Sequence, residues 1–235
     1  MNYKKITFAL SAICILFLCA ILFLLKRDGY FTFLANTVSD THYSYMDNAQ
    51  YTQRETMFEL SDLKQSDIVF VGDSITARSE WQEFFPDYTV LNRGIDSDVT
   101  EGVYHRLSSV TKTNPKKVFV MIGINDIRQH IDFDESLTYY SLLMSELKTS
   151  LPDSEIYIQS ILPVHSKTGI SNKEVANRNA SIKELAEHYQ LTYINIFDDM
   201  IDENYDLPTD YSVDGVHMTG AGYQVWLNKL RDYIP

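Results

Sequence analysis

The longest apolar stretch of the chain is a run of 20 uncharged residues near its start, residues 6–25, rich in Leu, Ile and Phe. As a helix, this run would be about 30 Å long, which is enough to cross the hydrocarbon core of a bilayer. Lys4 and Lys5 precede the run, and Lys26 and Arg27 follow it. We therefore expect residues 1–27 to be an N-terminal membrane anchor formed by one transmembrane helix.

The alternative for this segment is a cleaved signal peptide, which needs a shorter apolar region that ends in a small-x-small site. Ala20 is the only small residue near the end of the run, and apolar residues continue past it to Leu25. The uncleaved anchor is therefore favoured over secretion after cleavage. The few residues before the run are too short to hold a domain, so we expect the folded part on the extracytoplasmic side of the membrane.

The apolar pattern changes after residue 65 into short continuous runs. Runs of this kind are typical of strands that are buried on both faces of a parallel sheet. Five of them follow one another, at residues 68–71, 89–91, 117–122, 155–161 and 191–196. The sequence therefore predicts a parallel five-stranded sheet.

Between these runs the apolar positions recur at helical spacing, which predicts amphipathic helices. Four such segments cover residues 100–109, 134–150, 172–189 and 220–233, and a fifth, at 47–63, precedes the first strand. Strands that alternate with helices form a parallel sheet with helices on both faces. We therefore expect residues 28–65 to be a linker with a packing helix, and residues 66–235 to be one α/β domain.

The charge of the chain is divided unevenly between these segments. Residues 1–27 hold four of the 20 basic residues and none of the 32 acidic ones, so the remainder carries 16 − 32 = −16. This acidic balance disfavours nucleic acid and anionic lipid as partners, since both bind clustered Lys and Arg. It also argues against a strongly anionic polymer as substrate, although the charge can equally serve solubility alone. Both cysteines, Cys14 and Cys19, lie in the apolar run, so residues 28–235 offer no thiol.

Four short strings carry the candidate chemistry: residues 72–76 (GDSIT), 92–94 (NRG), 123–126 (GIND) and 214–217 (DGVH). Ser74, Gly94 and Asn125 each follow one of the first three predicted strands. Because the carboxyl ends of parallel strands meet at one edge of a sheet, we expect these residues to lie together there. The loop before the last helix can bring the fourth string to the same edge.

The residue types in these strings suit acyl transfer. Ser74 is the candidate nucleophile, and His217 is the candidate general base, oriented by Asp214 three residues earlier. The N–H groups of Ser74 and Gly94 and the side chain of Asn125 are candidate donors to an oxyanion.

Each of these residues also has a simpler interpretation. Asp73 and Ser74 can cap the following helix, Gly94 and Asn125 can be loop residues, and His217 can lie on the surface. Asp73 and Asp126 are expected to be structural. The other histidines show no metal-ligand spacing and are interpreted as surface or core residues: His42, His105, His130, His165 and His188.

The four strings, in this order, resemble those of the SGNH (GDSL-type) hydrolase superfamily, and Ser74, Gly94, Asn125, Asp214 and His217 match its motif residue by residue. The stretches 68–76, 92–107 and 217–223 are similar to the platelet-activating-factor acetylhydrolase type. Asp96-Ser97-Asp98 departs from that type, which tends to have a glycine pair before an Asp, and Ile75 replaces the usual Leu. The resemblance implies a flavodoxin-like three-layer α/β/α fold, with no metal and no organic cofactor.

We therefore expect a serine esterase that removes a small acyl group, with acetyl as the first candidate, from a carbohydrate or related ester at the cell surface. A lysophospholipase or thioesterase is an alternative that membrane proximity favours. An O-acyltransferase fits less well, because the large multi-span partner domain is absent from the sequence. A non-catalytic glycan-binding domain is the last alternative, and the complete set of site residues argues against it. The oligomeric state is left open.

Overall fold

The computed structural model describes residues 43–234. The predicted anchor at residues 1–27 and the linker as far as residue 42 lie outside this part of the chain. Within residues 43–234, no helix is both long enough and apolar enough to cross a membrane.

The core of the fold is a five-stranded sheet in which all paired strands are parallel. The strands are β1 (Ile68–Gly72), β2 (Val90–Gly94), β3 (Lys117–Met121), β4 (Glu155–Gln159) and β5 (Thr192–Ile194), in the order β2-β1-β3-β4-β5. This confirms the predicted α/β fold and its parallel sheet. Since β1 lies between β2 and β3, the chain reverses its winding direction beside β1, which is the position where such sheets bind ligands.

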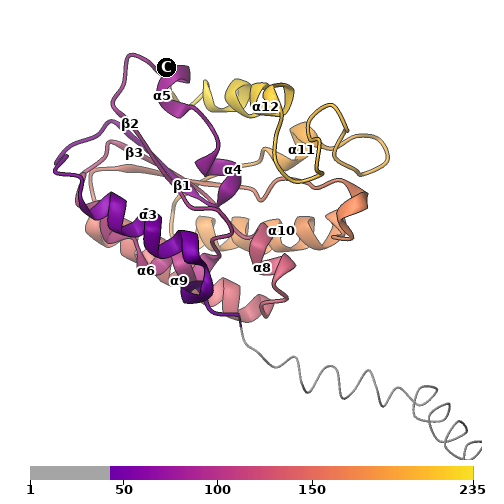
Figure 1. Ribbon diagram of the computed structural model, residues 1–235, viewed down its shortest axis with the longest axis horizontal. Helices are drawn as coiled ribbons and strands as arrows, with labels where there is room; N and C mark the ends of the chain where they lie inside the picture. Colours follow the sequence, from indigo (N-terminus) through magenta and orange to yellow (C-terminus); the bar gives the residue numbers. More distant parts are fainter. Residues whose placement is uncertain (1–42, 235) are drawn as a thin grey trace, which may run out of the picture. The chain divides into compact units, whose positions relative to one another are not determined.

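Helices cover both faces of this sheet (Figure 1). On one face lie α5 (Trp81–Phe84), α11 (Phe197–Met200) and α12 (Gly220–Leu230). On the other lie α3 (Ala49–Glu59), α6 (Thr100–His105), α9 (Phe133–Ser150) and α10 (Asn172–His188). The result is three layers, with the sheet in the middle.

A row of aromatic side chains runs across three strands. Phe70, Phe119 and Tyr157 occupy neighbouring register positions, and their ring centres are 5.1 Å and 4.5 Å apart. Trp81 of α5 stacks on Phe70 at 3.9 Å and meets Trp226 of α12 edge-on at 4.9 Å. Burial of these large rings fixes α5 and α12 on the sheet beside the end of β1.

Several element boundaries differ from those predicted. The single helix expected at 100–109 is two short helices, α6 and α7 (Ser108–Thr111), because Arg106 turns into the interior between them. The packing helix is shorter than 47–63: a 3₁₀ turn η1 (Tyr45–Asp47) precedes it, and Asn48 caps α3. The structure also has short helices that have too few residues to show a period: α4 (Ser74–Ala77), α8 (Ile124–Arg128) and the 3₁₀ turn η2 (Ser166–Thr168).

Candidate active site

Ser74 is the first residue of α4, directly beyond the end of β1. Asp73 caps this helix, and its Oδ1 accepts a hydrogen bond of 2.9 Å from the Ile75 N–H. Tyr223 of α12 donates its hydroxyl to the Ile75 carbonyl at 2.7 Å. These contacts hold α4 at both its start and its side, so the Ser74 side chain has a defined position at the sheet edge.

His217 lies in a tight loop before α12. The Ser212 hydroxyl closes this loop, since it donates to the His217 carbonyl at 2.8 Å and accepts the Gly215 N–H at 2.8 Å. Gly215 has a φ of +95°, and a Cβ there would lie 2.9 Å from Thr168 Cγ2. Glycine is therefore required at this turn, because it permits both the left-handed backbone and the close contact.

The loop brings the three candidate catalytic side chains into one hydrogen-bonded chain. Ser74 Oγ is 2.9 Å from His217 Nε2, and His217 Nδ1 is 2.6 Å from Asp214 Oδ2. Asp214 Oδ1 also accepts the N–H groups of Val216 and His217, at 2.9 Å and 2.8 Å.

These contacts assign the protonation states of the site. Burial raises the pKa of Asp214, but hydrogen bonds from the His217 ring and from the Val216 and His217 N–H groups outweigh it and hold the pKa well below its usual range. An ionised carboxylate can only accept, so His217 Nδ1 must carry a proton. In the neutral ring, Nε2 is then free to accept the proton of Ser74, which is the arrangement that activates a serine.

The sequence predicted that Gly94 would follow the second strand. In the structure it is the last residue of β2. A Cβ at Gly94 would lie 2.2 Å from the Ala77 nitrogen and 2.8 Å from the Asp73 carbonyl oxygen. The absence of a side chain therefore allows β2 to lie directly against α4. The Gly94 N–H donates to Asn92 Oδ1 at 2.9 Å, while Asn92 Nδ2 contacts the carbonyls of Thr76, Ala77 and Ser79.

Asn125 lies on α8, beyond the end of β3, and is 3% exposed. Its Nδ2 donates to the Asp98 carbonyl at 2.9 Å. An amide nitrogen has two protons, so this bond fixes the side chain and leaves one proton available. Ser74, Gly94 and Asn125 thus lie at the ends of three adjacent strands.

A buried ion pair supports this edge, and the sequence interpretation missed it. Arg106 Nε lies 2.7 Å from Asp98 Oδ2, and the other guanidinium nitrogens donate to the Arg93 and Gly72 carbonyls at 2.7 Å and 3.0 Å. Burial raises the pKa of Asp98 to about 6, although Arg106 lowers it. Arg106 therefore joins the carboxyl ends of β1 and β2. Only the charge of Arg106 within an apolar helical stripe could have indicated this role.

Two further buried carboxyl groups lie behind the site. Burial raises the pKa of Asp73 to about 7, against the hydrogen bond from Ile75. Burial also raises the pKa of Asp126, whose oxygens accept from the Thr100 N–H and the Ser136 hydroxyl. Both side chains hold backbone segments, in the way that the sequence had predicted for structural residues.

The segment that departs from the platelet-activating-factor acetylhydrolase pattern has its own contacts. Asp96 forms an ion pair of 2.9 Å with Arg78, just after α4. Ser97 has a φ of +62°, a left-handed value that glycine adopts more readily than serine. Among residues 43–234, no cluster of three or more His, Cys, Asp or Glu side chains could hold a metal ion.

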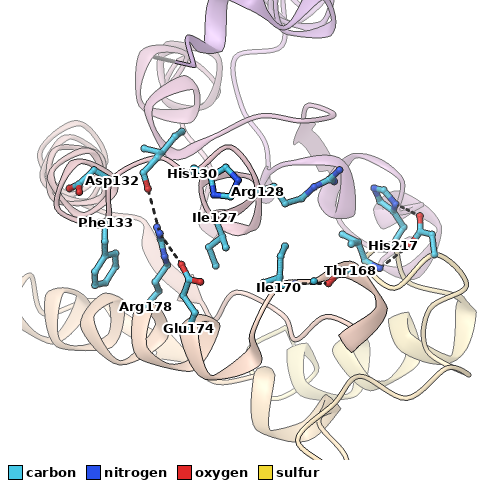
Figure 2. Close-up of a pocket in the computed structure, with 14 residues that line it drawn as sticks. Ile127, Arg128, His130, Asp132, Phe133, Thr168, Ile170, Glu174, Arg178 and His217 are labelled. Atoms are coloured by element: carbon cyan, nitrogen blue, oxygen red, sulfur yellow. Dashed lines mark hydrogen bonds and ion pairs between the residues drawn. The ribbon is translucent and has the colours of Figure 1, made fainter. Parts of the chain in front are cut away.

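A pocket of about 810 Å³ opens beside His217 (Figure 2). Its wall comes from the end of α8 and the segment that leads to the start of α9, from the end of η2 and the loop after it, from α10 and from the His217 loop. The wall contains both apolar and polar side chains. The apolar ones include Ile127, Ile170 and Val216, and the polar ones include Arg128, His130 and Thr168. The pocket can therefore hold a small polar organic molecule next to the candidate base.

A parallel α/β fold with a Ser–His–Asp chain at the switch point of its sheet is the arrangement that serine hydrolases use. Comparison with known proteins makes this specific: the model of the GDSL-like lipase/acylhydrolase family matches residues 70–225. The chain belongs to this family, and it is an ester hydrolase.

Individual relatives agree with this assignment. The chain is 25% identical over 178 residues to the rat platelet-activating factor acetylhydrolase IB subunit alpha2, which covers 73% of this chain and 77% of the relative. A solved structure of a candidate platelet activating factor from Streptococcus pneumoniae is 30% identical, with a TM-score of 0.72 over 79% of this chain and 91% of that one.

Two further solved structures share the fold. One is a GDSL-like lipase from Bacteroides thetaiotaomicron, 23% identical, with a TM-score of 0.68 over 79% of this chain and 97% of that one. The other is an acetyl-xylooligosaccharide esterase from Geobacillus, 20% identical, with a TM-score of 0.59 over 72% and 94%.

Proposed function

We propose that this protein is a serine esterase that removes a small acyl group, acetyl in the first place, from a carbohydrate or a related ester. The observation that carries the proposal is the hydrogen-bonded chain from Asp214 through His217 to Ser74. Asp214 and His217 of this chain also line the pocket. In this proposal Ser74 is the nucleophile, His217 the general base and Asp214 its orienting group.

The first step forms an acyl-enzyme. Ser74 Oγ attacks the ester carbonyl carbon while its proton passes to His217 Nε2, 2.9 Å away. The imidazolium that results is stabilised by the Asp214 carboxylate. His217 then returns the proton to the leaving alcohol as the bond between the carbonyl carbon and the alcohol oxygen breaks.

The second step releases the acyl group. A water molecule gives a proton to His217 and attacks the acyl carbon, and His217 returns that proton to Ser74. Each step passes through a tetrahedral oxyanion, for which the Ser74 N–H, the Gly94 N–H and the second proton of the Asn125 amide are the proposed donors. The Gly94 N–H would have to turn from Asn92 Oδ1 toward the oxyanion.

The size and polarity of the substrate are proposed from the pocket and the relatives. The wall of the pocket has polar side chains that can bind hydroxyl groups, including Thr168, Asp132 and Glu174. The rat relative is by its name an acetylhydrolase, and the Geobacillus relative an esterase of acetyl-xylooligosaccharides. Both names support acetyl as the acyl group, and the second supports a carbohydrate as its carrier.

Chain-length profiles with purified protein test this proposal. We expect p-nitrophenyl acetate to be hydrolysed with a higher kcat/KM than the octanoate or palmitate ester, and Ser74→Ala to abolish the activity. Equal slow hydrolysis by wild type and Ser74→Ala would refute the esterase mechanism, and a preference for long chains would favour the lysophospholipase or thioesterase. A fluorophosphonate probe should label wild type but not Ser74→Ala, whereas a binding domain would not be labelled.

We further propose that residues 1–27 anchor the enzyme in a membrane, with the α/β domain on the extracytoplasmic side. The uncharged run of residues 6–25 and its basic flanks support this proposal. The full chain should remain in the membrane fraction after a high-salt wash, and a chain that starts at residue 43 should not. Release of the full chain by salt would contradict the anchor.

A further inference from the structure

Within residues 43–234, Arg128 is a cation in the pocket wall without a hydrogen-bond or ion-pair partner. Two arginines line the pocket, Arg128 and Arg178. Arg178 lies 3.3 Å from Glu174 Oε1 and 4.9 Å from the ring centre of Phe133. Arg128 has no such contact. It is the last residue of α8, and it is exposed to solvent.

The carboxylates of the pocket wall do not neutralise Arg128, since each one is engaged elsewhere. Asp214 binds His217, Glu174 binds Arg178, and Asp132 Oδ1 accepts the N–H groups at the start of α9. His130 also lies in the wall, and its side chain has no hydrogen-bond or ion-pair partner among residues 43–234. Arg128 is therefore a cation of the pocket wall that no carboxylate binds, although the wall holds three carboxylates against two arginines and the domain as a whole is strongly acidic.

The position of Arg128 relates it to the reacting ester. Arg128 and Asn125, a proposed oxyanion donor, are three residues apart on α8, and so about 5 Å apart along the helix. Figure 2 shows the Arg128 side chain running from α8 toward His217. A group that binds Arg128 would thus lie about the width of one sugar ring from the scissile bond.

We propose that Arg128 selects esters that carry an anionic group, a carboxylate or a phosphate, within about one sugar ring of the acyl oxygen. The substrate class is then an acylated acidic sugar or sugar phosphate, whose anion forms a two-pronged hydrogen bond with the guanidinium. This inference rests on the proposed esterase function and adds the charge of the substrate to it. A single bound anion is compatible with the acidic domain, whereas a densely charged polyanion is not.

The test uses two esters that differ only in charge, 4-acetoxybenzoate and its carboxamide, 4-acetoxybenzamide. For wild type we expect a higher kcat/KM for the carboxylate. In Arg128→Gln the ratio of the two values should fall roughly tenfold, and Arg128→Lys should keep part of the preference. Arg231→Gln is the matched control, because Arg231 is an exposed arginine after α12 that forms no ion pair within residues 43–234, and it should leave the ratio unchanged.

Each outcome can be assigned. A ratio that is the same in wild type and Arg128→Gln overturns the inference, as does an equal fall for both esters, which would indicate a structural role. If wild type and Ser74→Ala both fail to hydrolyse either ester, the proposed esterase function is refuted instead. Acetylated glucuronic acid and acetylated glucose 6-phosphate, each against acetylated glucose, then distinguish a carboxylate from a phosphate as the anion.

Discussion

At the scale of single residues, Asp214 performs two tasks with its two oxygens. One oxygen holds the His217 ring at 2.6 Å, and the other holds the backbone of the same histidine at 2.8 Å. The side chain is about half exposed, so its ionised form depends on these donors as well as on water. The same turn therefore keeps the Asp214 carboxylate ionised and fixes its position.

Asp214→Asn should reduce kcat on p-nitrophenyl acetate by about four orders of magnitude. An amide can donate to Nδ1, which favours the ring tautomer that has its proton on Nε2 and cannot accept from Ser74. The thermal unfolding midpoint should change little, because the amide oxygen still accepts from the turn. A fall of less than tenfold, with intact folding, would mean that Asp214 does not set the tautomer.

Gly94→Ala should lower the free energy of unfolding by about 1–3 kcal/mol, measured in urea, and should lower kcat as well. The added Cβ would meet the Ala77 backbone at 2.2 Å, and a backbone atom cannot move aside as a side chain can. Gly220→Ala is the matched control, since a Cβ there meets nothing within 4 Å, and it should be neutral or slightly stabilising. Equal effects of the two variants would contradict the close packing of β2 on α4.

At the scale of elements, the candidate site depends on helices of only four and five residues. Neither α4 nor α8 could form alone, because the first turn of a helix fixes the backbone of several residues for a single hydrogen bond. The Asp73 cap, the Tyr223 hydroxyl and the strands beneath them hold α4 in place. The cost is a buried carboxyl group, Asp73, which the fold favours in its protonated form.

Asp73→Asn should change how stability depends on pH. The pKa of Asp73 is raised from 3.8 to about 7 in the folded state, so the folded protein binds this proton more tightly than the unfolded chain does. Wild type must then lose stability as the pH rises from about 4 to 7, the range in which the unfolded chain has released this proton and the folded protein still holds it. Asparagine keeps the capping oxygen and has no proton to lose.

The measurement is urea unfolding of both proteins between pH 5 and pH 8. The stability of Asp73→Asn relative to wild type should increase up to about pH 7 and then stay constant. Asp87→Asn, at an exposed position, gives the background for loss of one carboxylate. A relative stability that decreases with pH would show that ionised Asp73 is favoured in the fold.

At the scale of the whole molecule, Arg106 connects parts of the chain that the sequence separates. Its guanidinium joins the end of β1, the end of β2 and the loop that contains Asp98, whose carbonyl in turn holds Asn125 beyond β3. Three adjacent strands therefore share one buried charge network. Its integrity should matter both for folding and for the relative positions of Ser74, Gly94 and Asn125.

Arg106→Met should lower the free energy of unfolding by about 3–5 kcal/mol, because Asp98 would stay buried without its partner. The double variant Arg106→Met/Asp98→Asn should recover part of this loss, and urea unfolding of all four proteins in the cycle measures the coupling. Additive effects of the two substitutions would contradict a coupled pair. The activity of the single variant should also fall, since two of its lost contacts hold the ends of β1 and β2.

The local pattern of the chain was sufficient to predict the succession of strands and helices along the sequence and the parallel sheet. It was also sufficient to find the strings that identify the family. These features depend on short-range periodicity and on residue types, which a sequence displays directly. Ser74 could be assigned to the end of the first strand for the same reason. The break between α6 and α7 could not be predicted, because Arg106 belongs to an apolar stripe by spacing and leaves it only to reach Asp98.

Contacts between distant segments were decided by packing, which no local pattern encodes. Three features arise only when the elements assemble: the position of each strand within the sheet, the hydrogen bond between Gly94 and Asn92, and the ion pair of Arg106 with Asp98. The pocket also forms only on assembly, because four separate segments build its wall. The same assembly leaves Arg128 without a carboxylate partner, since Glu174 binds Arg178 and Asp214 binds His217. The sequence thus specified an ester hydrolase, and the assembled fold defined the surroundings in which its substrate would bind.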